Sequence, residues 1–322
     1  MINCIGVLTS GGDAPGMNAC IRAVVRTAMA RHLQVKAINQ GFDGVMNCDF
    51  KDLQARDVGG IIQQGGTILQ TARCKEFYTP EGQDKGLKNL RYGGIDAVII
   101  IGGDGSMRAA MALHERGFPV MGVPASIDND IWGTNMAIGV DTALNTIVEA
   151  IDKLRDTASS HKRAFLVETM GRRCGYLALM SGVIGGAEMV LIPEVDTPLE
   201  DVAETIAEAY ARGKTHAIVI VAEGARFNAT AIAKYLDENA AALQTRVTIL
   251  GHIQRGGRPT AYDRLLAARF GVKAVEALSE GAMGQMVAQT GREVALVPLA
   301  EVTSRQREAN LDYYRMGKML AK

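Results

Sequence analysis

Short apolar runs rich in β-branched residues alternate along the chain with segments of helical periodicity. The apolar runs span residues 5–9, 35–39, 97–101, 119–123, 164–168, 217–222 and 247–250, and helical periodicity covers 17–32, 106–116, 141–155 and 260–279. This alternation predicts an α/β fold in which mostly parallel sheets lie between two layers of helices, a three-layer α/β/α arrangement. Because such sheets bind ligands beyond the carboxyl ends of their strands, the residues that follow each strand are the first candidates for a site.

The composition limits the class of protein. A chain of 322 residues exceeds the usual size of one domain, so we expect two lobes, with one large α/β domain as the alternative. The 35 basic residues balance the 35 acidic ones, which argues against a nucleic acid or an anionic membrane as a partner bound by bulk charge. The five cysteines are widely spaced and never form a CxxC pair, a pattern typical of reduced cytoplasmic thiols. No apolar run approaches the roughly 20 residues of a membrane helix, so we expect a cytoplasmic protein.

Two glycine-rich turns follow predicted strands and open helices, namely residues 11–16 (GGDAPG) and 102–106 (GGDGS). Their backbone N–H groups and the helix dipole favour an anion such as phosphate. The alternative is that glycine only permits tight packing of strand against helix. Asp104 inside the second turn would repel a phosphate unless a cation came with it, which favours a Mg²⁺ ion that bridges carboxylate and phosphate. Otherwise Asp104 would cap a helix that starts near Ser106.

Two further carboxylates follow the run at 119–123, in the segment Ser126-Ile127-Asp128-Asn129-Asp130. If this segment is extended, Asp128 and Asp130 point to the same side of it. One of them could then take a hydroxyl proton during phosphoryl transfer. An Asx-turn is the alternative, and the position of the segment on the same sheet edge as GGDGS favours catalysis.

Several arginines could hold a phosphate through two hydrogen bonds. They are Arg73, Arg163, Arg172, Arg246 and Arg255. Arg172 and Arg255 come directly after predicted strands, which makes them the stronger candidates. His252 has a similar position, and a packed or capping role is equally open for it. No grouping of His, Glu and Cys has the spacing of a zinc site.

A second basic group lies away from these strand ends. Arg22 and Arg26 stand four residues apart on one face of the predicted helix 17–32. Further candidates for the group are Arg155, Arg212, Lys214 and His216. Together they could form a second anion site, although spacing alone favours solvated helix faces.

Long motifs carry a resemblance to a known family. The chain contains, in order, GVLTSGGDAPGMNA, IGGDGS, SIDND, VEAIDKLRDTASSH, ETMGRRCGY, AEGA and LGHIQRGG. Over essentially its whole length it resembles the bacterial ATP-dependent members of the 6-phosphofructokinase family. The resemblance implies a homotetramer of two-domain subunits that transfers the γ-phosphate of ATP to the 1-hydroxyl of fructose 6-phosphate. We expect an ATP-binding domain of residues 1–138 and about 253–303, and a sugar-phosphate domain of 139–252 and about 304–322.

The resemblance also implies roles for single residues. The catalytic set comprises Asp128 as the base, Asp130 as its companion carboxylate, Ser126, and Arg172, which stabilises the transferring charge. The ATP-binding positions are Gly12, Arg73, Cys74, Gly103, Asp104, Gly105 and Ser106, and Asp104 matches the Mg²⁺ position. The sugar-phosphate positions are Ser126, Ile127, Asp128, Met170, Gly171, Arg172, Glu223, His252, Ile253, Gln254 and Arg255. Arg163 and Arg246 match arginines that reach the 6-phosphate from a neighbouring subunit.

The second basic group resembles the effector site of the family, where a nucleoside diphosphate (ADP or GDP) activates and phosphoenolpyruvate inhibits. The matching positions are Arg22, Arg26, Arg155, Gly186, Glu188, Arg212, Lys214 and His216. Two departures bear on regulation, because Ala55 stands where an arginine is common and Thr215 where a lysine is frequent. Two others bear on the active site, where Ala125-Ser126 replaces Gly-Thr and Cys74 replaces an aromatic residue.

Other functions remain open at this stage. Pyrophosphate-dependent relatives tend to carry Asp in place of Gly105 and Lys in place of Ala125, so the small residues here favour ATP as the donor. NAD and lipid kinases share the GGDG turn but lack the SIDND and HIQRGG partners. A non-catalytic nucleotide sensor would be free to lose Asp104, Asp128 and Arg172, all of which are present.

Overall fold

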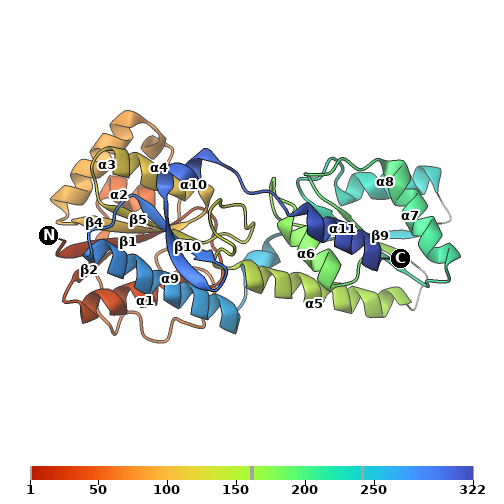
Figure 1. Cartoon of the computed structure of the whole chain (residues 1–322), viewed down its shortest axis with the longest axis horizontal. Coiled ribbons are helices and arrows are strands. Elements are labelled where there is room, and N and C mark those ends of the chain that lie inside the picture. Colours follow the sequence, from red (N-terminus) through yellow and green to blue (C-terminus); the bar gives the residue numbers. More distant parts are fainter. Residues whose placement is uncertain (1, 160–162, 241–242, 322) are drawn as a thin grey trace. The chain divides into compact units, whose positions relative to one another are not determined.

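The structure is a computed structural model that describes residues 2–159, 163–240 and 243–321. Two compact units make up the chain (Figure 1). Unit 1 comprises residues 1–127, 131–142 and 255–306, and unit 2 comprises 128–130, 143–254 and 307–322. Each unit has its own sheet and its own layers of helices. The last two residues of the VEAIDKLRDTASSH motif lie outside the described residues.

Unit 1 contains seven described strands, most of which match the apolar runs of the sequence. They are β1 (Cys4–Ser10), β2 (Gln34–Ile38), β3 (Phe50–Asp52), β4 (Ala97–Gly102), β5 (Val120–Pro124), β10 (Gln285–Thr290) and β11 (Glu293–Pro298). Its helices are α1 (Met17–Ala30), α2 (Phe42–Asn47), η1 (Glu76–Tyr78), α3 (Pro80–Tyr92), α4 (Asp104–Glu115), α9 (Ala261–Ser279) and α10 (Leu299–Ser304). α5 (Val140–Ser159) begins in unit 1 and continues in unit 2.

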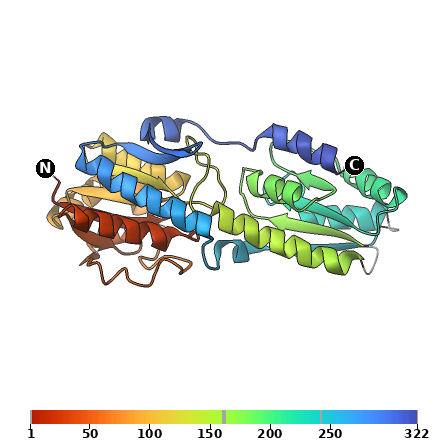
Figure 2. The same cartoon turned by 60° about the horizontal axis from the view of Figure 1, so that its bottom comes forward.

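The sheet of unit 1 has the strand order β11-β10-β5-β4-β1-β2-β3. β1 and β4 are buried along their whole length and pair in parallel, whereas β3 and β11 pair antiparallel at the two edges. α1 and α9 lie side by side on one face, and α4 packs with α10 on the other (Figure 2). The carboxyl ends of β1 and β4 are neighbours, with Ser10 opposite Gly102, so the two glycine turns start side by side.

Unit 2 contains a parallel sheet with the order β7-β8-β6-β9. Its strands are β6 (Ala164–Thr169), β7 (Met189–Leu191), β8 (Ala217–Ala222) and β9 (Thr245–Ile249). Its helices, besides most of α5, are α6 (Tyr176–Ile184), α7 (Leu199–Ala211), α8 (Ala229–Asn239) and α11 (Leu311–Leu320), and η2 (Gly251–Arg255) follows β9.

Successive residues of β8 face opposite layers of unit 2. Val219 and Val221 join a buried cluster with α7 and α8. On the other face, a Cβ on Gly182 of α6 would lie 3.6 Å from Ile220, so α6 packs closely on the strand. The predicted α/β class with mostly parallel sheets between helical layers is therefore confirmed.

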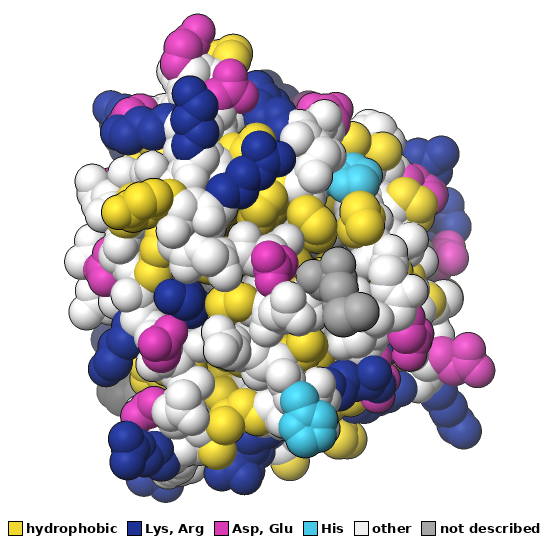
Figure 3. Space-filling view, turned by 90° about the vertical axis from the view of Figure 1, so that its left-hand side faces the viewer, with side chains coloured by type: hydrophobic (Ala, Val, Ile, Leu, Met, Phe, Trp, Pro, Cys, Tyr) yellow, Lys and Arg dark blue, Asp and Glu magenta, His cyan; other side chains and the backbone are white. Residues whose placement is uncertain are grey.

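Two further observations concern the hydrophobicity of the helices and the charge on one face. No helix in the described part of the chain is long and apolar enough to cross a bilayer. On the face of the molecule in Figure 3, basic and acidic side chains are interspersed with hydrophobic ones between them, and no wide basic patch gathers there.

Candidate active site

The two glycine turns of unit 1 meet at the ends of β1 and β4. A Cβ on Gly11 would lie 3.5 Å from Ser106 Oγ and 4.0 Å from the Gly103 nitrogen. Gly102 admits no side chain, because its Cβ would lie 2.4 Å from the Ser10 carbonyl oxygen. α1 begins after Gly16, whose φ is 108°, without a side-chain cap. Both turns thus lead into helix N-termini, where backbone N–H groups and the helix dipole favour an anion such as phosphate.

Neighbouring side chains line the first of these turns. The Arg255 guanidinium donates to the Asp13 carbonyl at 3.2 Å and occupies the space that a Cβ on Gly12 would need. Thr71 Oγ donates to the Gly11 carbonyl at 2.6 Å and holds the segment of Arg73 and Cys74 beside the turn. Arg73 is exposed and Cys74 half-buried.

Asp104 does not cap a helix that begins near Ser106. α4 begins at Asp104 itself. The Asp104 carboxylate accepts hydrogen bonds from Arg108, one turn later, at 3.0 Å from Nε and at 3.3 Å from Nη2. Within the described ranges, no three His, Cys, Asp or Glu side chains are grouped to hold a metal ion alone. A Mg²⁺ ion that binds phosphates needs only one or two carboxylates, so Asp104 fits an ion that arrives with a nucleotide.

The segment that follows β5 is not extended, so the geometry that would point Asp128 and Asp130 to the same side does not hold. Ile127 and Asp128 form a turn, and Asn129 has a φ of 52° in the left-handed region. Asp128 is therefore buried, whereas Asp130 is half-buried. Ser126 lies beside the second glycine turn, where a Cβ on Gly103 would be 3.8 Å from its Cβ. The turn, rather than an extended strand, thus carries Asp128.

Asp128 is paired with Arg172 inside unit 2. Arg172 Nε lies 3.2 Å from Asp128 Oδ2, and the side chains are 57% and 2% exposed. Arg172 follows β6 in a tight turn, with φ values of 143° at Gly171 and 51° at Arg172. A Cβ on Gly171 would lie 2.6 Å from the Cys174 carbonyl oxygen, so only glycine fits there.

Side chains distant in sequence hold the backbone of this turn. Glu223 Oε1 accepts the N–H of Arg172 at 2.7 Å and that of Gly171 at 3.3 Å. Gln254, which is fully buried, accepts the N–H of Met170 at 3.2 Å through Oε1. Gly224 packs against the Arg172 carbonyl so closely that no Cβ fits. The predicted residues Met170, Gly171, Glu223 and Gln254 therefore converge on Arg172.

Other predicted sugar-phosphate residues lie elsewhere in unit 2. Arg163 precedes β6, and Arg246 is paired in register with Phe165, so both lie at the opposite end of β6 from Arg172. The Arg163 Nε atom is buried without a hydrogen-bond partner among the described residues. His252 and Ile253 are exposed on η2. The structure thus does not bring Arg163 and Arg246 to the Asp128–Arg172 pair of the same chain.

The chain is similar to known proteins in both sequence and fold. The phosphofructokinase family model, described as "Phosphofructokinase", matches residues 4–278. The chain belongs to the phosphofructokinase family. It is 52% identical over 317 residues to the ATP-dependent 6-phosphofructokinase of Natranaerobius thermophilus and 49% identical over 318 residues to that of Thermotoga neapolitana, covering 98% of this chain and 99% of each relative. Its fold matches T-state Pichia pastoris phosphofructokinase with a TM-score of 0.90 and 37% identity, covering 94% of this chain and 36% of that one.

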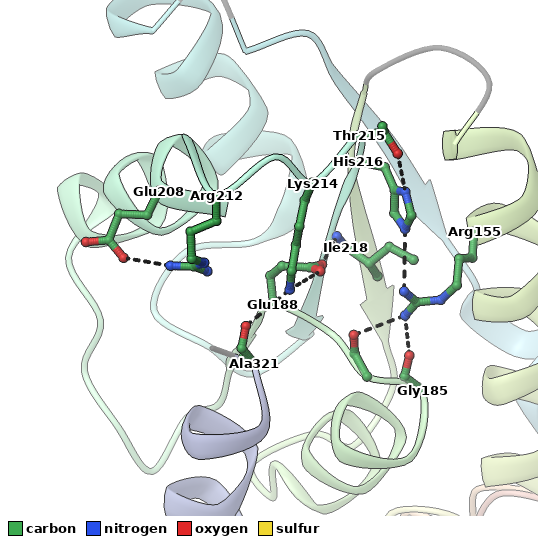
Figure 4. A network of polar contacts seen from close by, with 11 residues as sticks. Arg155, Gly185, Glu188, Glu208, Arg212, Lys214, Thr215, His216, Ile218 and Ala321 are labelled. Atoms are coloured by element: carbon green, nitrogen blue, oxygen red, sulfur yellow. Dashed lines mark hydrogen bonds and ion pairs between the residues drawn. The ribbon is translucent and has the colours of Figure 1, made fainter. Parts of the chain in front are cut away.

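The second basic group of this family member is largely brought together in unit 2 (Figure 4). Arg155 Nη2 donates to the carbonyls of Gly185 and Gly186, and its Nη1 lies 3.5 Å from His216 Nε2. Lys214 Nζ donates at 3.1 Å both to Glu188 Oε1 and to the Ala321 carbonyl. Burial lowers the pKa of His216; Glu188 opposes this shift, whereas Arg155 and Lys214 add to it.

Glu188 is the buried centre of this group. Its side chain is 3% exposed, and its second oxygen accepts the Ile218 N–H at 2.5 Å. Arg212 binds Glu208 of α7 at 3.4 Å, and Arg22 and Arg26 belong to α1 of unit 1. A cavity of about 350 Å³ lies between α7 and α11 and borders Glu188, Arg212 and Ala321. No sequence motif indicated this cavity.

Proposed function

We propose that this protein is a glycolytic kinase that transfers the γ-phosphate of ATP to the 1-hydroxyl of D-fructose 6-phosphate, giving fructose 1,6-bisphosphate and ADP. The observation that carries the proposal is the buried Asp128 carboxylate paired to Arg172 at the end of β6, in a chain of the phosphofructokinase family. Relatives of the same length and about half identical in sequence are named ATP-dependent 6-phosphofructokinases.

Asp128 acts as the general base in the proposed reaction. Its carboxylate takes the proton of the 1-hydroxyl as that oxygen attacks the γ-phosphorus, and the bond from the γ-phosphorus to the β–γ bridging oxygen breaks to release ADP. Arg172 stabilises the charge of the transferring phosphoryl group. The exposure of the Arg172 side chain supports its role, because the guanidinium can reach a ligand while it stays paired to Asp128. Asp130, as the companion carboxylate of Asp128, and Ser126 complete the catalytic set.

Residues of unit 1 bind the nucleotide. Gly12, Arg73, Cys74 and the segment from Gly103 to Ser106 contact ATP, and Asp104 with the phosphates would hold Mg²⁺, which neutralises phosphate charge when bound. Gly105 supports ATP over pyrophosphate, because it is exposed and a Cβ there would have nothing within 4 Å. The adjoining turns at Gly11 and Gly103 offer N–H groups to the phosphates.

Residues of unit 2 bind the sugar phosphate, with Met170, Gly171, Glu223, His252, Ile253 and Gln254 as contacts, joined by Ile127 and by Arg255. Arg163 and Arg246 serve the site of a neighbouring subunit in a cytoplasmic homotetramer. Their place at the far end of β6 from Arg172 supports this assignment, since neither can serve the Arg172 turn of its own chain. No described residue accepts a hydrogen bond from the buried Arg163 Nε, which fits a partner supplied on assembly.

The cluster around Glu188 binds effectors in the proposed enzyme. ADP or GDP and phosphoenolpyruvate would bind through Arg155, Lys214, Arg212 and His216, with Arg22 and Arg26 and the backbone at Gly186. Glu188 discriminates between them, because its carboxylate can hold the metal of a diphosphate and repel a bare anion.

One assay tests the donor and the activity together. Purified protein is given fructose 6-phosphate and Mg²⁺ with either ATP or pyrophosphate, and bisphosphate is measured. We expect product with ATP. Product only with pyrophosphate would make the protein a pyrophosphate-dependent enzyme, and no product with either donor would favour a nucleotide sensor that keeps the fold.

A further inference from the structure

One carboxylate outside every motif of the sequence reaches the turn that carries Arg172. Glu194 follows β7, is half-buried, and accepts the N–H of Gly175 at 2.9 Å through Oε1 and at 3.1 Å through Oε2. Its Oε1 also accepts the N–H of Ala309 at 2.8 Å. A single side chain thus joins two segments that lie more than a hundred residues apart in the sequence.

The first of these segments is the Arg172 turn. Gly175 is the N-cap of α6 and has no side-chain cap of its own, so the Glu194 carboxylate fills that role from outside the helix. Within the turn, the Cys174 N–H donates to the Gly171 carbonyl at 2.9 Å. A Cβ on Gly175 would lie 2.5 Å from Ile192 Cβ, so the turn presses against the segment that carries Glu194. Moving Gly175 would therefore move Arg172.

The second segment leads to Asp128. Two residues before Ala309, the Arg307 N–H donates to the Asp130 carbonyl at 3.4 Å. The Arg307 guanidinium also lies 5.4 Å from the ring centre of Tyr176, the first residue of α6. Burial lowers the pKa of Arg307, with Tyr176 opposing the shift. The segment 307–309 thus contacts both the turn of Asp128 and the start of the helix behind Arg172.

We propose that Glu194 is a positioning residue for phosphoryl transfer, which locks the Arg172 turn to the segment 307–309 and so fixes Arg172 against Asp128. The inference rests on the proposed function, because it assigns Glu194 a part in that reaction. Glu194 touches neither reacting atom. Its effect comes from geometry, since a misplacement of about 1 Å at a charged group can cost on the order of 100-fold in rate.

The test compares three variants of the full-length protein. Glu194→Ala removes the acceptor of both N–H groups, and we expect kcat to fall roughly 10- to 100-fold with the KM for ATP changed less than about twofold. Glu194→Gln keeps one carbonyl oxygen at the Oε1 position, and it should recover most of the lost turnover. Asp196→Ala is the matched control, because Asp196 lies two residues on and binds only the exposed Arg226 among the described side chains; it should behave as wild type.

A double-mutant cycle with Arg172→Ala separates positioning from simple support of the fold. If Glu194 acts through Arg172, removing Glu194 costs little more once Arg172 is absent, and the two losses in kcat are not additive. Additive losses would overturn the proposal, as would a Glu194→Ala variant of normal kcat. If Glu194→Ala does not fold, the shorter Glu194→Asp, which withdraws the carboxylate from both N–H groups, carries the same cycle.

A readout without substrate keeps this inference distinct from the proposed function. Amide hydrogen exchange of residues 170–177 should rise at least about tenfold in Glu194→Ala and stay unchanged in Asp196→Ala. Should the wild type fail to phosphorylate fructose 6-phosphate, the proposed function falls, and faster exchange would still show that Glu194 holds the turn. Unchanged exchange would overturn the positioning role whatever the activity.

Discussion

The backbone N–H of Arg172 donates to Glu223 Oε1 at 2.7 Å, while its guanidinium binds the buried carboxylate of Asp128 at 3.2 Å. Arg172 has a φ of 51°, a conformation that costs free energy for a residue with a Cβ. Glu223 offsets this cost by accepting two N–H groups of the turn. The position of the Asp128–Arg172 pair therefore depends on a carboxylate at the end of β8.

Replacing Glu223 should reduce turnover. Glu223→Ala removes a charged acceptor of two N–H groups, an interaction worth about 1.5–3 kcal/mol per bond, so we expect kcat to fall by roughly one to two orders of magnitude together with a higher KM for fructose 6-phosphate. Arg226→Ala is the control, because its ion pair with Asp196 is exposed and contributes about 0–1 kcal/mol. Steady-state kinetics measure both. A higher KM at normal kcat would make Glu223 a substrate contact alone.

Gly105 tests the choice of phosphate donor. Gly105→Asp places a carboxylate in the first turn of α4, where open space and the helix dipole favour folding. We expect the KM for ATP to rise at least about tenfold, because the carboxylate repels the phosphates and fills their space. Gly105→Ala is the control and should keep ATP binding with equal or greater thermal stability. An unchanged KM for ATP in Gly105→Asp would contradict the assigned position of the nucleotide.

Lys214 tests the effector site. Lys214→Gln removes a cation that binds the buried Glu188. We expect the affinity for ADP and for phosphoenolpyruvate, measured from their effect on fructose 6-phosphate kinetics, to fall at least about tenfold. The matched control is Lys234→Gln on α8, whose contact with Glu238 is exposed at 3.9 Å. Titration of each effector gives the affinity. A full response in Lys214→Gln would remove the cluster from regulation.

The buried Asp263 carboxyl should make the free energy of unfolding depend on pH. Burial raises the pKa of Asp263 from 3.8 to about 6, although Thr142 and Gly139 donate hydrogen bonds to it. Between these values the folded chain binds the proton more tightly than the unfolded chain, so this group's contribution to stability falls as pH rises from about 4 to about 6. The loss is at most about 3 kcal/mol.

The comparison with Asp263→Asn isolates this effect, because the amide does not titrate. The melting temperatures of both proteins are measured from pH 4 to pH 7. As the pH rises, the melting temperature of the wild type should fall by several degrees relative to that of the variant. The conversion is ~2–4 °C per kcal/mol for chains of 150–250 residues. A difference in melting temperature that stays constant with pH would show that the Asp263 pKa is not raised.

The strands and the class of fold follow from local sequence, and much of the site does not. Apolar runs such as 217–222 coincide with β8 because buried parallel strands need apolar residues on both faces. The antiparallel edge strand β11 and the short β7 carry weaker patterns and were not predicted. At Asp128 the spacing of two carboxylates could not reveal the backbone conformation, since the left-handed Asn129 turns the chain where an extended segment was one of two possibilities.

The residues that sequence reasoning missed are those that act over long separations. Glu194 meets Gly175 and Ala309, and Arg307 meets Asp130, through contacts that only the folded chain creates. Neither lies within a recognised motif. Arg108 could have been found from its spacing of four residues after Asp104 on one helix.

Asp128 is the general base of the proposed reaction. The most direct measurement is the kcat of Asp128→Asn with fructose 6-phosphate and Mg-ATP, with nucleotide affinity measured on the same sample by calorimetry. We expect kcat to fall by about 10²–10⁴-fold, with ATP affinity within about twofold of wild type, because the amide cannot accept the hydroxyl proton. Turnover within a few-fold of wild type would contradict the account.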